Sequence, residues 1–303
     1  MISIYTRSNR ITTLEFWKWQ AKKVLKKYSG PDAVADSLIR GLTQLDVEFE
    51  VNPKKPTRTV VVISGVAALQ DMIRAKQSGT IGSLIAGPCI VTSPLEHNKI
   101  LASPEIDRIV VPSEWVRNFY AHQIPNIADK IRVWPAGVST SEPSSKSGPI
   151  IIYDKNFSTE SLSEAFAAIS SLSLESRTFT YGTFKKDEYL KALRSAPLMI
   201  YLSRSESQGI ALQEAWTRDV PTLIPYSGTW KSLGHEWKDD MINAPYLTDA
   251  TGSFYKNKDE LSQLIQTITK GSSPFAPKAY CDVHLSDLAS ARILIQLIHE
   301  AND

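Results

Sequence analysis

The sequence has few cysteines, and it contains no long apolar run. Cys89 and Cys281 are far apart and show no metal-ligand or redox spacing, so we expect two reduced thiols in a cytosolic protein and no disulfide scaffold. No run of about 18 apolar residues occurs, so no membrane-spanning helix is expected. Residues 1–5 are too short an apolar stretch, with too polar a continuation, to predict a secretory signal.

A strong charge of either sign is also lacking. The formal net charge of the chain is +2, with 34 basic and 32 acidic side chains, which argues against a nucleic-acid-binding protein. We find no Asp-x-Asp or His-x-x-x-His pattern in a setting that suits a metal, so neither a metal nor a cofactor is expected. The hydrophobic content of 42% is that of an ordinary soluble protein, and 303 residues suffice for two domains.

What the chain does contain is an alternation of short β-rich runs with amphipathic helical stretches, the pattern of parallel sheets covered by helices. The expected strands are residues 1–5, 47–51, 59–64, 83–86, 108–111 and 131–134 in the first half, and 149–153, 178–181, 198–202 and 222–224 in the second. The expected helices are residues 31–45, 113–121, 159–171, 185–194, 209–218, 258–269 and about 285–300. The fold class is therefore α/β, with two doubly wound, Rossmann-like domains.

A segment rich in serine, proline and glycine, residues 139–149, predicts the linker between them. We place an N-terminal domain at residues 1–140 and a C-terminal domain at 146–284, with the last helix, 285–303, packing back on the first. Open α/β sheets bind ligands at the carboxyl ends of their strands, so two such domains would face each other across a cleft. His97 and Ser113 follow first-half strands and could line it; for His97 an ordinary surface loop is the alternative.

The most informative motif begins at the end of the expected strand 198–202. Glu206 and Glu214 lie eight positions apart across Gly209, where that strand passes into a helix. Backbone amides at residues 207–210 would then be unpaired donors at a helix N-terminus, which favours phosphate. At most about 12 Å would separate the two acids, room for a diphosphate between them. The plainer interpretation is a glutamate that flanks the helix and another that is solvated on it.

Four segments resemble the GT-B glycosyltransferases of the retaining, nucleotide-sugar-dependent type, glycosyltransferase family 4. Residues 206–215, with 219–224 after them, resemble the E-x7-E motif of that family and its following strand. The other three are residues 108–117, 131–138 and 181–193, which resemble the late strand and helix of the N-terminal domain, the entry into the linker, and the stretch before the motif. The resemblance covers most of residues 83–225.

The resemblance implies roles for individual residues. Glu206 would contact the hydroxyls of the donor sugar as the catalytic-site acid, and Glu214 would contact the ribose. The remaining donor-binding residues implied at this site are Lys155, Gly182, Arg204, Ser207, Gln208, Gly209 and Ile210.

The chain also departs from the family pattern. The family's Arg-x4-Lys pair after the first strand of the C-terminal domain is absent, which leaves Lys155, with Arg204 as a possible substitute for the arginine. Ser139 stands where the family commonly has aspartate. Gly30, before a helix, takes the place of a glycine-rich loop near the donor phosphates.

The implied function is transfer of a hexosyl group from a nucleotide-diphosphate sugar to a glycan or lipid-linked acceptor in polysaccharide biosynthesis, with retention of configuration and without a metal. The alternative is a non-catalytic nucleotide- or glycan-binding protein on the same fold. A glycoside hydrolase fits less well, because it needs two carboxylates across one bond and no phosphate site between them.

One more segment bears on partners. In residues 16–28 and the adjoining Leu14, helical spacing places apolar side chains on one face with lysines around it. This stripe consists of Leu14, Trp17, Ala21, Leu25 and Tyr28. Basic amphipathic helices with tryptophan suit anionic membrane surfaces, which predicts peripheral contact with the inner membrane face. The alternative is an ordinary helix whose apolar stripe packs inward.

Overall fold

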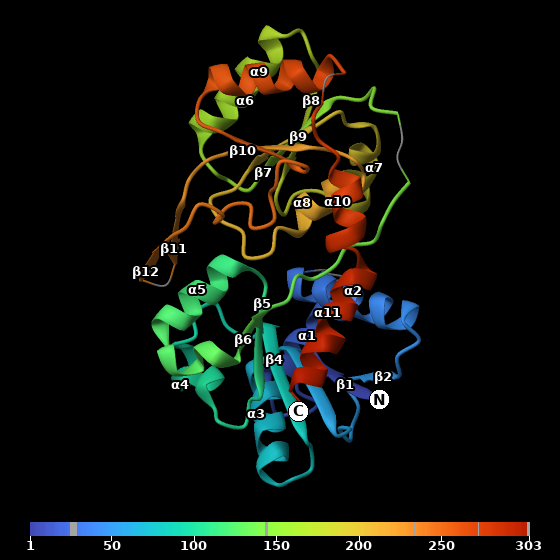
Figure 1. The fold of residues 1–303 in the computed structure, drawn as a ribbon, viewed down its shortest axis with the longest axis vertical. Coiled ribbons are helices and arrows are strands. Elements are labelled where there is room, and N and C mark those ends of the chain that lie inside the picture. Colours follow the sequence, from blue (N-terminus) through green and yellow to red (C-terminus); the bar gives the residue numbers. More distant parts are fainter. Residues whose placement is uncertain (25–28, 143–144, 233, 272, 302–303) are drawn as a thin grey trace. The chain divides into compact units, whose positions relative to one another are not determined.

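The computed structural model describes residues 1–24, 29–142, 145–232, 234–271 and 273–301. The chain divides into two compact units (Figure 1). The first comprises Met1–Gly137 and Asp287–Asp303, and the second Val138–Ser286. The division thus falls at Gly137–Val138, ahead of the Ser/Pro segment in which we expected it, and the C-terminal helix belongs to the first unit.

The first unit is built on a six-stranded parallel sheet with the order β2-β1-β3-β4-β5-β6. Its strands are β1 (Ile2–Tyr5), β2 (Phe49–Val51), β3 (Thr59–Ser64), β4 (Ser83–Cys89), β5 (Arg108–Val111) and β6 (Ile131–Val133). Its helices are α1 (Leu14–Val24), α2 (Gly30–Gln44), α3 (Val66–Gln77), α4 (Glu96–Lys99), α5 (Glu114–Gln123) and α11 (Asp287–Glu300), with 3-10 turns η1 (Ile100–Ala102) and η2 (Pro125–Lys130). In β3 the residues Val60 to Ile63 are fully buried, as expected for a parallel strand covered on both faces.

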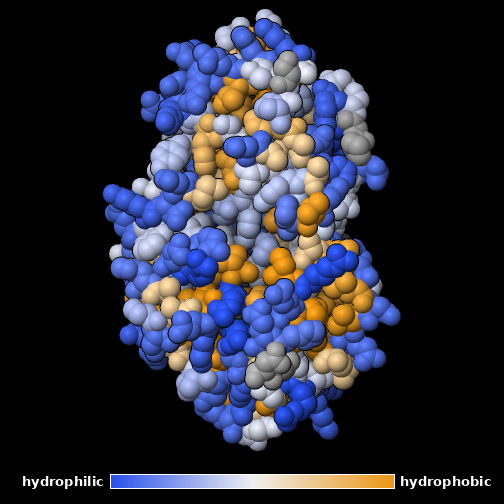
Figure 2. All heavy atoms as spheres, in the orientation of Figure 1, coloured by the Kyte–Doolittle hydropathy of each residue, from blue (hydrophilic) through white to orange (hydrophobic). Residues whose placement is uncertain are grey.

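The second unit has a five-stranded parallel sheet with the order β13-β10-β9-β7-β8. Its strands are β7 (Ile150–Asp154), β8 (Ser176–Thr180), β9 (Met199–Leu202), β10 (Thr222–Pro225) and β13 (Gly252–Tyr255), beside an antiparallel hairpin of β11 (Thr229–Ser232) and β12 (His235–Lys238). Its helices are α6 (Thr159–Ser171), α7 (Lys186–Ser195), α8 (Ile210–Trp216), α9 (Lys258–Thr269) and α10 (Pro277–His284). Hydrophilic side chains cover most of the face drawn in Figure 2, and apolar ones show in patches.

Strand order repeats between the units. When the strands of each unit are numbered along the chain, both sheets contain the order 2-1-3-4-5, and the first adds its sixth strand beyond the fifth. This is a doubly wound order, and the direction of winding reverses between β1 and β3 and between β7 and β9. The predicted fold class, two Rossmann-like parallel-sheet units, is confirmed.

Several helices and strands of the structure were not predicted from the sequence. All ten expected strands are present, with ends that differ by at most three residues, whereas β11, β12, β13, α3, α4 and α10 were not expected. The β11–β12 hairpin has only one apolar side chain in each strand, Trp230 and Trp237, so it lacks the buried-strand signal. α4 contains residues in the left-handed backbone region, His97 and Asn98 among them, which no helical periodicity would reveal.

Helix α11 is held within the first unit by polar contacts as well as apolar packing. The Arg40 guanidinium of α2 donates two hydrogen bonds to the Asp287 carboxylate, from Nε at 2.6 Å and Nη2 at 3.0 Å. The buried Trp134 indole donates to the Ser290 carbonyl at 3.0 Å. A Cβ added to Gly41 would lie 2.2 Å from the Asp287 carbonyl oxygen, so only glycine allows this close approach of α2 and α11.

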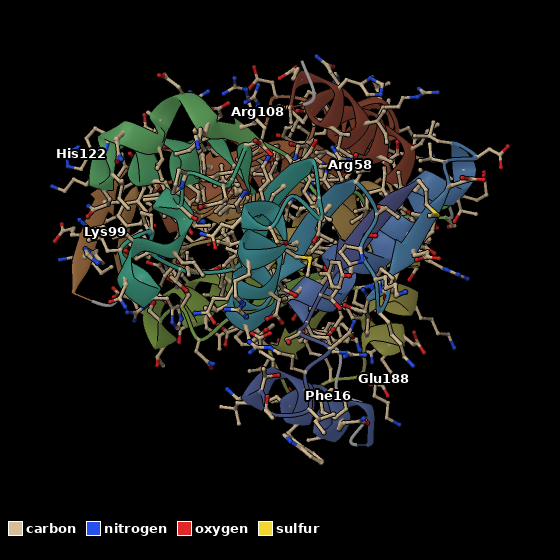
Figure 3. The ribbon with its side chains drawn as sticks, turned by 90° about the horizontal axis from the view of Figure 1, so that it is seen from below. Phe16, Arg58, Lys99, Arg108, His122 and Glu188 are labelled. Carbon is tan, nitrogen blue, oxygen red and sulfur yellow. The ribbon has the colours of Figure 1, made fainter. Side chains whose placement is uncertain are left out.

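Helix α1 turns Glu15 inward and Leu14 and Trp17 outward. Glu15 accepts hydrogen bonds from the Ala67 and Ala68 amides at the start of α3, at 2.6 and 3.3 Å. Leu14 and Trp17 are 67% and 60% exposed. Of the predicted stripe, Leu25 and Tyr28 lie outside the described residues. Figure 3, with Phe16 labelled, shows α1 at the edge of the view. The alternative of inward packing is therefore wrong for Leu14 and Trp17.

We expect Gly41→Ala to lower the free energy of unfolding by about 1–3 kcal/mol, because the added methyl group forces α2 and α11 apart. The measurement is urea denaturation followed by circular dichroism. Gly30→Ala is the matched control on the same helix, since nothing lies within 4 Å of a Cβ there. It should leave stability unchanged or raise it by about 0.5 kcal/mol. Equal stability of the two variants would contradict the close-contact argument.

Candidate functional site

The site lies at the carboxyl ends of β7 and β9, where the winding of the second sheet reverses. The two strands pair in parallel with Asp154 opposite Leu202. The Lys155 amide donates to the Leu202 carbonyl at 2.8 Å, so the chain segments that follow the two strands begin side by side. Ligands of open α/β sheets bind at this kind of position.

Glu206 is the centre of a cluster at this edge. Its Oε1 accepts hydrogen bonds from Lys155 Nζ at 2.5 Å, the Tyr201 hydroxyl at 2.7 Å and Ser203 Oγ at 2.9 Å. The side chain is only 11% exposed, against 26% for Lys155. The Glu206 amide donates to the Ile242 carbonyl at 2.7 Å, which ties the loop to the segment beyond the hairpin. Three donors and a backbone bond therefore hold this carboxylate in place.

Two tyrosines form the floor of the cluster. The Tyr153 and Tyr201 rings are stacked, with centroids 5.1 Å apart and an interplanar angle of 22°. Burial, and then the nearby Glu206 carboxylate, raise the pKa of Tyr201 well above its usual value. Burial followed by Glu206 and Glu214 raises the pKa of Tyr153. Both phenols stay protonated at neutral pH, so Tyr201 is a permanent hydrogen-bond donor to Glu206.

Glu214 has a lysine of its own. Its carboxylate, 12% exposed, lies 2.7 Å from Lys186 Nζ, which is 41% exposed. Lys186 is the first residue of α7, after Lys185 at the N-cap. Lys186 was not among the site residues expected from the sequence. The available signal was two lysines at a helix N-terminus, where the helix dipole disfavours positive charge.

The turn between the two acids passes through Gly209, as expected, but the helix that follows it is shorter. Gly209 has the left-handed backbone angles φ 75° and ψ 41°, as the strand-to-helix passage requires, and Gln208 is buried while Ser207 is exposed. Helix α8 spans Ile210–Trp216, seven residues, and is shorter than the expected 209–218. Amide donation from residues 207–210 stays a prediction.

Arg204 and Gly182 lie on neighbouring loops of the same edge. Arg204 Nε donates to the Phe157 carbonyl at 3.0 Å, which places this arginine against the β7–α6 loop that also carries Lys155. Gly182 follows β8 with φ 85°. The ring of Tyr181 beside it is 58% exposed, and Lys155 Nζ lies 5.1 Å from its centroid. The structure thus brings Lys155, Arg204 and Glu206 to one edge of the sheet.

The three candidates of the first unit lie on separate elements. Gly30 is the first residue of α2, Ser113 is the buried N-cap of α5, and His97 lies in α4. Within the described ranges, no hydrogen bond or ion pair joins them to one another. Their role at a cleft stays a prediction.

Neither a metal centre nor a membrane span emerges from the described residues. Over those residues, no group of three or more histidine, cysteine, aspartate or glutamate side chains could hold a metal ion. No helix in the same part of the chain is long and apolar enough to cross a bilayer.

Comparison with known proteins identifies the fold. No protein-family model matches the chain, and no curated protein matches it. Among solved structures, the apo form of WaaB, a lipopolysaccharide outer core galactosyltransferase, matches with a TM-score of 0.60 at 11% identity, over 99% of each chain. Sucrose-phosphate synthase from Thermosynechococcus elongatus matches with 0.56 at 11% identity, over 99% of this chain and 98% of its own. The G117R mutant of S. aureus TarM, bound to fondaparinux, alpha-GlcNAc-glycerol and UDP, matches with 0.54 at 12% identity, over 88% and 58%.

One of these structures is a galactosyltransferase and another is a sucrose-phosphate synthase, and the chain shares their GT-B fold, as the sequence resemblance implied. At 11–12% identity the likeness defines the fold. The roles of individual residues therefore rest on the geometry of the site.

Lys155→Met should lower the free energy of unfolding by about 1–3 kcal/mol, because the Glu206 carboxylate would lose its cationic donor in a mostly buried setting. Adding Glu206→Gln should recover part of that loss, and the coupling between the two changes measures the ion pair. Urea denaturation of the single and double variants gives both quantities. Lys185→Met, which removes an exposed lysine, is the control and should stay within about 0.5 kcal/mol of wild type. Strictly additive changes would contradict the pairing.

Proposed function

We propose that the protein is a glycosyltransferase that uses a nucleotide-diphosphate sugar, with a glycan or lipid-linked acceptor, retention of configuration and no metal. The observation that carries this is the pair of motif carboxylates, Glu206 and Glu214, each held by a lysine at the winding-reversal edge of the second sheet. The GT-B fold supports the same proposal.

The two acids would bind different parts of the donor. Glu206, steadied by Tyr201 and Ser203, would accept hydrogen bonds from sugar hydroxyls. Glu214 would accept them from the ribose, with the diphosphate between the two. Such pre-set acceptors orient the anomeric carbon without reorganisation during the reaction.

The leaving diphosphate needs positive charge. Lys155 would have to divide its hydrogen bonds between Glu206 and the phosphates, since it already contacts that carboxylate. Arg204 bonds a backbone carbonyl of the β7–α6 loop, so its charge is not cancelled by that contact. We therefore assign Arg204 the role of the arginine missing from the Arg-x4-Lys pattern. Donor contacts from Gly182 and from the amides of Ser207, Gln208, Gly209 and Ile210 complete the proposed site.

The second candidate is a non-catalytic nucleotide- or glycan-binding protein. The engagement of Lys155 by Glu206 favours it, because a paired lysine neutralises a leaving group less well. Transfer or donor hydrolysis by the purified protein decides between the two, since a binding protein shows neither.

A matching nucleoside diphosphate should raise the melting temperature, because a ligand that binds only the folded state stabilises it by about 2.7 kcal/mol at a hundredfold excess over its Kd. UDP, GDP, ADP and CDP are the probes, with thermal denaturation as the readout. Glu214→Ala should abolish the shift. Glu236→Ala is the control, since Glu236 is an exposed acid of the β11–β12 hairpin, and it should retain the shift. The absence of any shift with all four probes in the wild type would count against the proposal.

We also propose that the protein is cytoplasmic and binds anionic phospholipid at the inner membrane face through α1. Ile11, Leu14 and Trp17 are each at least 60% exposed on this part of the first unit. Lys18 is exposed among them, and lysines follow at positions 22, 23, 26 and 27 in the sequence. Exposed tryptophan and leucine beside clustered positive charge match the chemistry of an anionic bilayer surface. Such contact fits a lipid-linked acceptor.

Co-sedimentation with vesicles of phosphatidylcholine and phosphatidylglycerol, mixed about three to one, tests this contact. The double variant Leu14→Ser, Trp17→Ala should bind at least about tenfold more weakly, because it removes most of the apolar area that would enter the interface. Val283→Ser removes an equally exposed apolar side chain, 67% exposed, from the second unit and should bind as wild type does. Unchanged binding by the double variant would refute the assignment of this surface.

A further inference from the structure

The start of helix α7 carries positive charge where the helix itself disfavours it. Lys185 is the N-cap and Lys186 the first helical residue, at the end where the dipole favours anions. The acidic residues Asp187 and Glu188 follow and partly offset the cost. A local arrangement that runs against helix stability is expected where a residue serves a site.

Lys186 faces the second acid of the motif. Its Nζ lies 2.7 Å from Glu214 Oε1. Glu214 is mostly buried at 12% exposure, whereas Lys186 is 41% exposed and reaches it from the solvent side. Lys186 thus holds one oxygen of the Glu214 carboxylate, and the burial of Glu214 already limits the motion of that side chain.

The two helices that carry this pair are themselves locked together. The Tyr189 hydroxyl of α7 donates to the Ala211 carbonyl of α8 at 2.8 Å, and Tyr189 is 1% exposed. Burial and the Glu214 charge raise its pKa, so the hydroxyl keeps the proton that it donates. Lys186 lies within one helical turn of Tyr189, so the Tyr189–Ala211 hydrogen bond fixes the backbone at Lys186 relative to the start of α8.

We infer that Lys186 is a positioning residue that orients the Glu214 carboxylate toward the 2′- and 3′-hydroxyls of a ribose, and so makes the site selective for ribonucleotides. The inference rests on the proposed function, in which Glu214 is the ribose acceptor. A carboxylate recognises two adjacent hydroxyls only when both of its oxygens are presented in the right plane. Because the lysine holds one oxygen, the Glu214 carboxylate cannot rotate freely before the ligand binds. Ribose binding therefore does not have to order this side chain, which lowers the entropic cost of binding.

The test compares Kd values of ribonucleoside and 2′-deoxyribonucleoside diphosphates by isothermal titration calorimetry. The probes are UDP, GDP, ADP and CDP, each with its 2′-deoxy counterpart. For the base that binds, the wild type should prefer the ribonucleotide by about tenfold or more, since one hydrogen bond to a charged group is lost in the deoxy form. Lys186→Met should reduce this preference to about threefold or less and leave the 2′-deoxy Kd within about twofold.

Two further variants separate positioning from a general loss of charge. Lys186→Arg, which can still pair with Glu214, should restore most of the preference. Lys185→Met removes the same charge from the same helix end and should leave the preference unchanged. In a Glu214→Gln background, Lys186→Met should have no further effect on the preference, because the two residues act through one contact. Circular dichroism of each variant checks that the fold is intact.

Two kinds of failure are distinguishable. If Lys186→Met weakens binding of the ribonucleotide and of its 2′-deoxy counterpart equally, or leaves the ribose preference unchanged, the positioning role is wrong while the proposed donor site stands. If no diphosphate of either series binds the wild type, the proposed function itself fails, and the inference fails with it.

Discussion

The parallel pairing of β7 with β9 is the constraint on which the site depends. Because Asp154 stands opposite Leu202, both strands end at the same level, and the residues that follow them, Lys155 and Ser203, leave the sheet side by side. The winding reverses between these two strands, so their connections depart to opposite sides and do not cover this edge. The Lys155–Glu206 pair, 51 positions apart in sequence, is a direct result of that register.

Much of the fold was readable from the sequence, for a physical reason. Parallel strands covered on both faces are near-continuous apolar runs, and β3 and β9 show this plainly. Elements without that signal were missed: the β11–β12 hairpin is antiparallel and carries one apolar side chain in each strand, Trp230 opposite Trp237. The outward orientation of Leu14 and Trp17 was not predictable from the sequence either, because helical spacing shows that the two residues share a face but not which way that face turns.

Glu206, Glu214 and Lys155 could be singled out from the sequence, whereas the pairing of each acid with a lysine could not. Glu206 and Glu214 stand out by spacing around Gly209, a local feature of one strand-to-helix passage. Lys186 is 28 positions from its partner Glu214 and belongs to another connection, so only the packing of α7 against α8 reveals the pair. Arg204 was a candidate by proximity in sequence, and its contact with the Phe157 carbonyl places it at the loop that lacks the arginine of the pattern.

The pairing of each motif acid with its own lysine has a kinetic consequence. Two carboxylates and two ammonium groups cancel, so beyond about 8–10 Å, the Debye length at physiological salt, these two pairs exert little field on an approaching anion, and Arg204 supplies the positive charge that is left uncompensated at this edge. Electrostatic steering raises association rates only where charge is left uncompensated. Any steering of a dianionic ligand toward this edge would thus come from Arg204, and the two paired lysines would act on the ligand only after arrival.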